Sequence, residues 1–241
     1  MLLAIDAGNS FVKIARHDGQ AWQAQQRVAL ADFCAEPSRY LQHAPPQIVI
    51  ANVAGPAFQA ALESALPRRA LQWVKASSQA CGVTNLYSPP QQLGADRWAI
   101  LVATRAITQD ACVVASFGTA LTVDMLAADG RFLGGVIAPG LHLMRTALAQ
   151  ATHAVQPPLG HFTRFPTNTA DALETGLVYA VLGVLAKVTS EFEAQTQCAV
   201  RCILTGGDAH FIAPYLTSAA QVEDNLVLEG LRLLARKESQ R

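Results

Sequence analysis

The chain opens, at residues 2–16, with LLAIDAGNSFVKIAR, and this stretch decides the fold class. Four apolar residues lead to Asp6, a turn follows at residues 6–10, and residues 11–16 alternate between apolar and polar side chains. Such alternation is typical of a half-buried strand, and Gly8-Asn9 suits a hairpin corner. We therefore expect a β-hairpin that carries a carboxylate, a glycine and a hydroxyl at its turn.

The same pattern returns about 110 residues later. Residues 111–126 read ACVVASFGTALTVDML, which is an apolar strand, a turn at 116–120 and a second strand, and a third strand is expected at 131–137. Self-similarity at half the chain length indicates duplicated units. We predict two βββαβα domains, at 1–108 and 109–241, with a cleft between them.

Apolar periodicity and turn residues predict the remaining elements. We expect helices over 30–41 (interrupted at Pro37), 57–66, 95–108, 140–151, 169–193, 208–216 and 225–237. Further strands are expected over 21–28, 47–53, 71–75 and 200–204.

The composition narrows the function classes. Lys and Arg number 18, as do Asp and Glu, so the net charge is zero and a broad nucleic-acid binder is disfavoured. No apolar run reaches the ~18 residues of a membrane helix, and the N-terminus lacks a secretory pattern. The five cysteines are odd in number and scattered, which favours reduced thiols. We expect a cytoplasmic protein without membrane or nucleic-acid partners.

The two glycine turns have the composition of a phosphate-binding site. Gly8 and Gly118 carry no side chain, so backbone amides there can approach an anion closely. Ser10 and Thr119 add hydroxyl donors, and Lys13 adds a positive charge. Two ordinary β-turns remain the alternative for either segment alone. The duplication favours phosphate binding, with both hairpins gripping a nucleotide.

A second constellation lies at residues 93–98, LGADRW, where a helix is expected to begin. The helix dipole explains an acidic residue such as Asp96 in the first turn, but it does not explain Arg97. Together the two side chains can offer a proton acceptor and an anion clamp. The glycine corner at 134–140 is compatible with scaffolding and with pocket lining, and the corner at 206–208 could let an adenine or a ribose approach the backbone.

Taken in order, these motifs resemble the type III pantothenate kinases, also called the Bvg accessory factor family. The motifs at 6–13 and 118–124 alone would indicate only the wider actin, hexokinase and Hsp70 superfamily. The segment Gly94-Ala95-Asp96-Arg97 between them is the specific part, and residues 134–140 and 168–169 complete the pattern.

The resemblance implies a duplicated ribonuclease H-like (actin-like ATPase) fold, βββαβαβα in each half, with an ATP cleft between the halves. It implies a homodimeric transferase that uses ATP and Mg²⁺ to phosphorylate pantothenate, the first step of coenzyme A biosynthesis. Two alternatives stay open: a phosphotransferase or phosphohydrolase with another acceptor, and a nucleotide-binding regulatory or transcription accessory protein with weak or no kinase activity.

The resemblance also assigns roles to individual residues. Asp96 is the proton acceptor, and Asp6 holds magnesium through water. ATP is bound by Thr119 and by a loop of eight residues: Asp6, Ala7, Gly8, Asn9, Ser10, Phe11, Val12 and Lys13. Pantothenate is bound by Tyr87, Gly94, Ala95, Asp96, Arg97 and Thr169.

One position departs from the family's pattern. Many members carry an Asp two residues before the Gly-Thr pair, where it ligates potassium or ammonium; this chain has Ser116. A neutral hydroxyl is a much poorer cation ligand than a carboxylate. We therefore predict that activation by a monovalent cation is weakened or absent.

Overall fold

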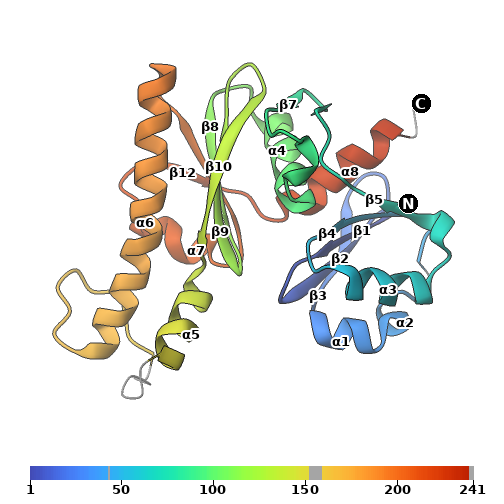
Figure 1. Ribbon diagram of the computed structural model, residues 1–241, viewed down its shortest axis with the longest axis horizontal. Helices are drawn as coiled ribbons and strands as arrows, with labels where there is room; N and C mark the ends of the chain where they lie inside the picture. Colours follow the sequence, from blue (N-terminus) through green and yellow to red (C-terminus); the bar gives the residue numbers. More distant parts are fainter. Residues whose placement is uncertain (43, 152–158, 239–241) are drawn as a thin grey trace. The chain divides into compact units, whose positions relative to one another are not determined.

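The structure, a computed structural model, describes residues 1–42, 44–151 and 159–238 (Figure 1). It divides into two compact units. Unit 1 comprises Met1–Gln109, Gly130–Phe132 and Asn225–Arg241, and unit 2 comprises Asp110–Asp129 and Leu133–Asp224.

Unit 1 is built on a five-stranded sheet in the order β3-β2-β1-β4-β5. Strand β1 is antiparallel to β2 and parallel to β4, as the opening hairpin predicts. The strands are β1 (Leu2–Ala7), β2 (Phe11–His17), β3 (Trp22–Ala29), β4 (Gln47–Asn52) and β5 (Leu71–Trp73).

Helices cover both faces of this sheet. On one face Phe33, Phe58 and Leu62 pack into a core with apolar residues of β1, β2 and β4. On the other face α8 contacts β1 and β4. The helical segments are α1 (Leu30–Ala35), α2 (Pro37–Tyr40), α3 (Pro56–Ala65), η1 (Arg68–Ala70), η2 (Pro90–Gln92), α4 (Ala95–Ile107) and α8 (Leu226–Glu238).

The helix predicted over 30–41 is two helices. Pro37 occupies the first turn of α2, and Glu36 before it takes φ −143° and ψ 63°. A proline disfavours the helical conformation in the residue that precedes it. The helix therefore breaks at Glu36, directly before Pro37, where the sequence predicts an interruption.

Unit 2 repeats the strand order of unit 1. Its strands run β10-β9-β8-β11-β12, with β8 antiparallel to β9 and parallel to β11. The predicted duplication of a βββαβαβα unit is confirmed, while the cleft between the halves stays a prediction. The strands are β8 (Cys112–Phe117), β9 (Ala120–Leu126), β10 (Arg131–Pro139, whose first two residues belong to unit 1), β11 (Arg201–Gly206) and β12 (Ala220–Val222).

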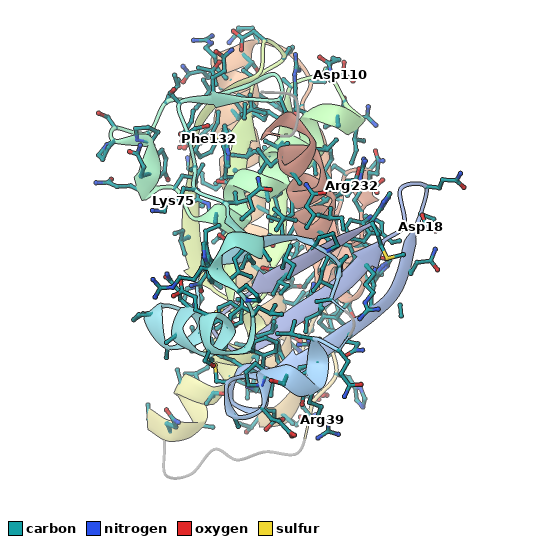
Figure 2. The ribbon with its side chains drawn as sticks, turned by 90° about the vertical axis from the view of Figure 1, so that its right-hand side faces the viewer. Asp18, Arg39, Lys75, Asp110, Phe132 and Arg232 are labelled. Atoms are coloured by element: carbon teal, nitrogen blue, oxygen red, sulfur yellow. The ribbon has the colours of Figure 1, made fainter. Side chains whose placement is uncertain are left out.

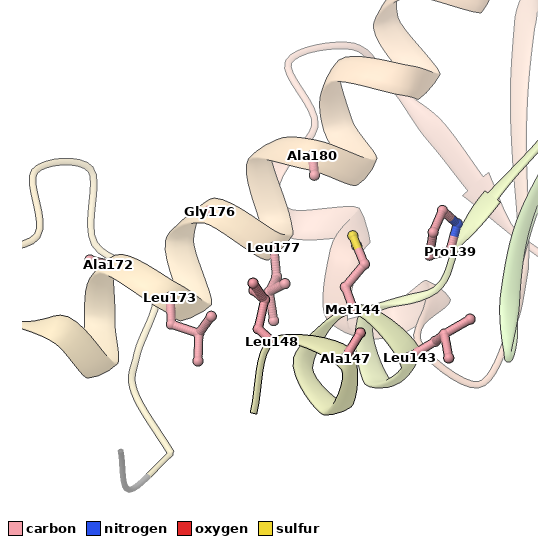
Figure 3. Close-up of a pocket in the computed structure, with 10 residues that line it drawn as sticks. All are labelled: Pro139, Leu143, Met144, Ala147, Leu148, Ala172, Leu173, Gly176, Leu177 and Ala180. Atoms are coloured by element: carbon pink, nitrogen blue, oxygen red, sulfur yellow. The ribbon is translucent and has the colours of Figure 1, made fainter. Parts of the chain in front are cut away.

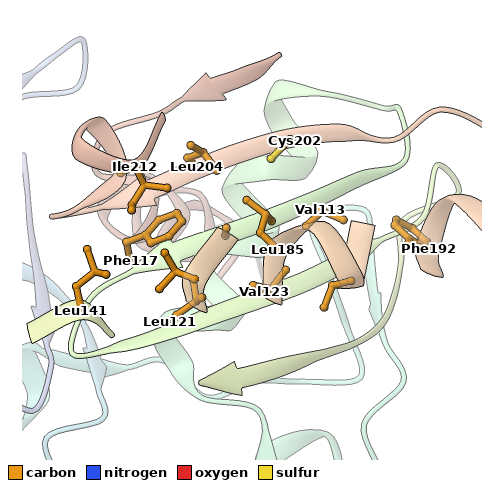
Figure 4. Packing of buried hydrophobic residues seen from close by; sticks show 14 of the residues in the cluster. Val113, Phe117, Leu121, Val123, Leu141, Leu185, Phe192, Cys202, Leu204 and Ile212 are labelled. Carbon is orange, nitrogen blue, oxygen red and sulfur yellow. The ribbon is translucent and has the colours of Figure 1, made fainter. Parts of the chain in front are cut away.

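Helix α6 (Thr169–Thr196) forms one side of the unit 2 core. Figure 4 shows Leu185 and Phe192 of α6 beside Val113, Phe117 and other residues of the sheet. By length and composition α6 could cross a membrane; 39% of its apolar window is buried, and its buried residues belong to the unit 2 core. The unit also contains α5 (Leu141–Ala151), the short α7 (Ala209–Ile212) and η3 (Ala213–Tyr215).

Two features of the fold were not predicted. The strands β6 (Gln79–Ala80), β7 (Val83–Asn85) and β12 are too short to show a period of two residues. Helix α8 lies at the end of the predicted C-terminal half, but it packs in unit 1. The domain boundary at 108/109 stays a prediction, because packing units and duplicated domains need not share limits.

Helix α8 meets α4 at a glycine, and this contact generates a stability prediction. A Cβ at Gly230 would lie 1.9 Å from the Ala99 carbonyl oxygen, whereas a Cβ at Gly183 on α6 meets nothing within 4 Å. We expect Gly230→Ala to lower the free energy of unfolding by about 2–3 kcal/mol, since the two helices must separate. Gly183→Ala should raise it by about 0.5–1 kcal/mol through helix propensity.

Urea unfolding of both variants measures these changes. Equal effects of the two substitutions would contradict the close approach of α8 and α4.

Candidate active site

Asp6 lies near the end of β1, where it pairs in register with Lys13 on β2 and Ala51 on β4. The residue is half-buried in the structure. This burial raises the pKa of Asp6 from 3.8 to about 7, the charge of Lys13 opposes the rise, and the charge of Asp96 adds to it. The charges of Lys13 and Asp96 therefore both act on the Asp6 carboxyl group.

The rest of the predicted ATP loop divides between core and surface. Ala7 and Val12 are buried in the unit 1 core. The Gly8 N–H donates to the Phe11 carbonyl over 3.0 Å and closes the turn, which leaves Asn9 and Ser10 exposed. Backbone and hydroxyl groups at the tip are thus accessible to a ligand.

Asp96 is positioned by the start of α4. Its Oδ1 accepts a hydrogen bond of 2.8 Å from the backbone N–H of Arg97. Burial raises the pKa of Asp96, and that hydrogen bond and the Arg97 charge oppose the rise. A Cβ at Gly94 would lie 2.5 Å from Oδ1, so glycine leaves the space that the carboxylate occupies. In the Gly-Ala-Asp-Arg motif, glycine is therefore needed for steric reasons, and Asp96 and Arg97 supply the chemical groups.

The Arg97 side chain is only 6% exposed and is held by two aromatic rings. Its Nη1 donates to the Tyr87 hydroxyl over 3.4 Å, and its guanidinium carbon lies 5.7 Å from the Tyr87 ring centroid and 5.9 Å from that of Phe132. A buried guanidinium keeps its charge. This site therefore presents a fixed cation beside the Asp96 carboxylate.

Two supporting residues were missed by sequence reasoning. The Asn85 side chain accepts from the Tyr87 N–H over 3.0 Å and donates to the Pro90 carbonyl over 3.1 Å, which fixes the loop carrying Tyr87. Phe132, labelled in Figure 2, lies 5.2 Å from the Tyr87 ring. Asn85 precedes the Tyr-Ser-Pro-Pro loop by two residues, and that proximity was the available signal. No sequence signal marked Phe132.

The second glycine turn is held by backbone packing in unit 2. The Gly140 N–H donates to the Thr119 carbonyl over 3.0 Å, and a Cβ at Gly140 would lie 2.2 Å from the Gly118 carbonyl oxygen. Gly206 has φ +97°, and a Cβ there would lie 2.3 Å from the Phe117 carbonyl oxygen. The two glycine corners that the sequence left open therefore pack against the turn at 117–119.

The remaining predicted residues also lie in unit 2. Thr119 is exposed in the turn, and Thr169 is exposed at the start of α6, directly after the Asn168 side chain that accepts from the Asp171 N–H. Their place in the site of Asp6 and Asp96 stays a prediction. Within the described residues, no cluster of three or more His, Cys, Asp or Glu side chains could hold a metal ion alone.

An apolar groove of about 540 Å³ lies between α5 and α6 of unit 2 (Figure 3). Leu143 in its wall is 44% exposed. The residues that line it are Pro139, Leu143, Met144, Ala147, Leu148, Ala172, Leu173, Gly176, Leu177 and Ala180.

Comparisons with known proteins cover almost the whole chain. The family profile described as type III pantothenate kinase matches residues 2–191. A type III pantothenate kinase of Nitrosospira multiformis is 39% identical over 243 residues, which cover 100% of this chain and 93% of the relative.

Two solved structures share the fold. A Baf family transcriptional activator from Campylobacter jejuni matches with a TM-score of 0.67 and 21% identity, covering 99% of this chain and 100% of the other. A 2-dehydro-3-deoxygalactonokinase protein from Sinorhizobium meliloti matches with a TM-score of 0.58 and 16% identity over 99% of each chain. The predicted actin-like fold class is confirmed.

The raised pKa of Asp6 generates a pH prediction. A carboxyl group whose folded pKa of about 7 exceeds its ordinary 3.8 binds protons preferentially in the folded state. The stability that it contributes is present below pH 4 and is lost as the pH rises to 7. We expect Asp6→Asn to flatten this slope and to raise the free energy of unfolding at pH 8 by about 2–4 kcal/mol.

Denaturant unfolding of both proteins from pH 4 to pH 8 measures the difference. Parallel pH profiles for Asp6→Asn and the wild-type protein would refute the raised pKa of Asp6.

Proposed function

The chain belongs to the type III pantothenate kinase family, and we propose that the Asp6, Asp96 and Arg97 cluster carries this family's reaction. The protein phosphorylates pantothenate with ATP, the first step of coenzyme A biosynthesis. The Asp96 carboxylate beside the buried Arg97 guanidinium is the observation that supports this assignment most strongly.

Asp96 is assigned the proton of the attacking hydroxyl group. The primary hydroxyl oxygen of pantothenate forms a bond to the γ-phosphorus, the bond from that phosphorus to the β,γ-bridging oxygen breaks, and ADP leaves. The hydroxyl proton passes to the Asp96 carboxylate. Burial raises the pKa of Asp96 and makes it a better proton acceptor, while the Arg97 N–H fixes Oδ1. Positioning supplies most of the catalysis in such transfers.

Arg97 and Tyr87 would hold an anionic or polar group of pantothenate. A guanidinium fork suits a carboxylate, and the two aromatic rings beside Arg97 limit its motion. Thr169 and the backbone at Gly94 and Ala95 complete the proposed pantothenate contacts.

ATP would be bound by the turn at 6–13 and by Thr119. The exposed residues Asn9 and Ser10 at the tip of that turn offer backbone groups and one hydroxyl to phosphate oxygens, and Lys13 adds a charge. The Asp6 carboxyl group fits a magnesium ion held through water, because a nearby cation would favour its ionised form. When bound, magnesium would neutralise phosphate charge.

Asp96→Asn tests the proton acceptor. We expect kcat to fall by roughly 10²–10⁴-fold, the usual contribution of a positioned base, with the fold intact by circular dichroism. Asp32→Asn, an exposed acid on α1, is the matched control and should keep its rate. The measurement is phosphopantothenate formation from ATP by purified protein.

Full activity of a folded Asp96→Asn variant would refute its role as the base. ATP binding without product in the wild-type protein would favour the regulatory alternative.

We also propose that the protein is a cytoplasmic homodimer. The homodimer follows from the family resemblance, and the apolar groove between α5 and α6 supplies a face that a second copy would cover. Free cysteines among the described residues fit a reducing compartment. A net charge of zero and the buried side of α6 support the absence of nucleic-acid and membrane partners.

Leu143→Glu tests the dimer face. A charge in a buried apolar interface is costly, so we expect the variant to be monomeric at concentrations where the wild-type protein is dimeric. Ile107→Glu replaces another exposed apolar residue outside the groove, and it should leave the dimer unchanged. Light scattering after gel filtration measures the mass, and a dimeric Leu143→Glu variant would exclude this face.

The monovalent cation of the family does not fit this chain. Ser116 is half-buried, and its register neighbours on β9 and β11 are Thr122 and Thr205. Three neutral hydroxyls offer no charge to hold potassium or ammonium. Weak or absent activation by these cations therefore remains part of the proposal.

A further inference from the structure

Three hydroxyl side chains form a row across the unit 2 sheet. Ser116 on β8 pairs with Thr122 on β9 and with Thr205 on β11. Their sequence neighbours Phe117, Leu121 and Leu204 lie in the core beneath α6. Because side chains alternate along a strand, the three hydroxyls share the opposite face.

The hydroxyl row has unused hydrogen-bonding capacity. Thr122 Oγ1 is buried and has no hydrogen-bond partner among the described residues. Within the same part of the chain, no hydrogen bond engages the side chain of Ser116 or Thr205. A buried hydroxyl without a partner costs about 1–3 kcal/mol, which a ligand atom can recover.

The duplicated fold shows which residues of unit 1 occupy the positions equivalent to the hydroxyl row. Strands β1, β2 and β4 correspond to β8, β9 and β11, and Asp6 there pairs with Lys13 and Ala51. Ser116 therefore occupies the position of Asp6, next to the end of its strand. At this position unit 1 carries the Asp6 carboxylate, and unit 2 carries hydroxyl groups.

No carboxylate replaces the missing charge within this row. Asp124 faces the same side of β9, but it pairs with Val114, two residues further from the turn. It is 1% exposed and is engaged by other groups. The row is thus a neutral set of donors beside the turn at Gly118 and Thr119.

We propose that Ser116, Thr122 and Thr205 bind a phosphate oxygen of the nucleotide directly and thereby replace the monovalent cation. This inference rests on the proposed function, which places ATP at Thr119. A carboxylate at 116 would repel a phosphate unless a cation stood between them, whereas hydroxyls donate to it. The row makes the nucleotide site independent of potassium.

Ser116→Asp and Ser116→Asn form a matched pair of similar size and different charge. We expect calorimetry with Mg²⁺ and ADP in choline chloride to show an affinity at least tenfold lower for Ser116→Asp, and potassium to restore most of it. Potassium should change the affinity of the wild-type protein and of Ser116→Asn by less than twofold. Potassium-dependent ADP binding by the wild-type protein would overturn the proposal.

Thr122→Val separates binding from folding, and it remains informative if Ser116→Asp does not fold. Valine keeps the shape and removes an unpaired hydroxyl, so the melting temperature without nucleotide should stay equal or rise. The affinity for ADP should fall by about 5–10-fold, the loss of one hydrogen bond. Unchanged affinity, or a loss that follows a lower melting temperature, would overturn the role of Thr122.

Activity is measured in the same salts. A wild-type rate that changes by less than twofold with potassium or ammonium supports the hydroxyl row, and a tenfold rise contradicts it. ADP affinity is read independently of phosphopantothenate formation. A protein that binds ADP without potassium but makes no product would therefore reject the kinase proposal and support the hydroxyl row.

Discussion

Two carboxyl groups whose pKa values are raised, Asp6 and Asp96, are the constraint on which the candidate site in unit 1 depends. Asp6 feels the charge of Asp96, and burial raises the pKa of both groups. The Lys13 charge opposes the rise at Asp6, and the Arg97 backbone N–H and charge oppose the rise at Asp96. Such an arrangement lowers stability near neutral pH, and perturbed carboxyl groups of this kind gather at functional sites, where stability is exchanged for activity.

Much of this site could be predicted from the sequence because its parts are local. The hairpin at 2–16 shows alternation and a glycine turn, and Asp96 and Arg97 stand in one helical turn. Phe132 was missed because its role arises from a tertiary contact with Arg97, whereas the Asn85 contact with Tyr87 is local and was overlooked. The packing of α8 on α4 is equally non-local, so the end of the chain could not be placed in unit 1 from its periodicity.

The glycine corners show how packing can resolve what a motif leaves open. Near Gly140 and Gly206 the backbone approaches the turn at 117–119 so closely that a Cβ would overlap it. A third glycine, Gly94, leaves room for a carboxylate. Gly140 and Gly206 therefore shape the turn at 117–119 in unit 2, and Gly94 leaves space for the Asp96 carboxylate in unit 1. Glycine is needed at Gly140 and Gly206 because the backbone approaches closely there, and at Gly94 because a side chain lies close.

Duplication supplied two equivalent strand ends, and the side chains on them have diverged in charge. Position 6 pairs with a lysine, so a carboxylate there has a neighbouring cation within the protein. Position 116 pairs with threonines, and a carboxylate there would have no cationic partner in its row. An acid at 116 thus needs an external cation, whereas a serine does not. In unit 2, removing the charge is therefore a physically simpler solution than retaining it, and it leaves donors that a phosphate can use.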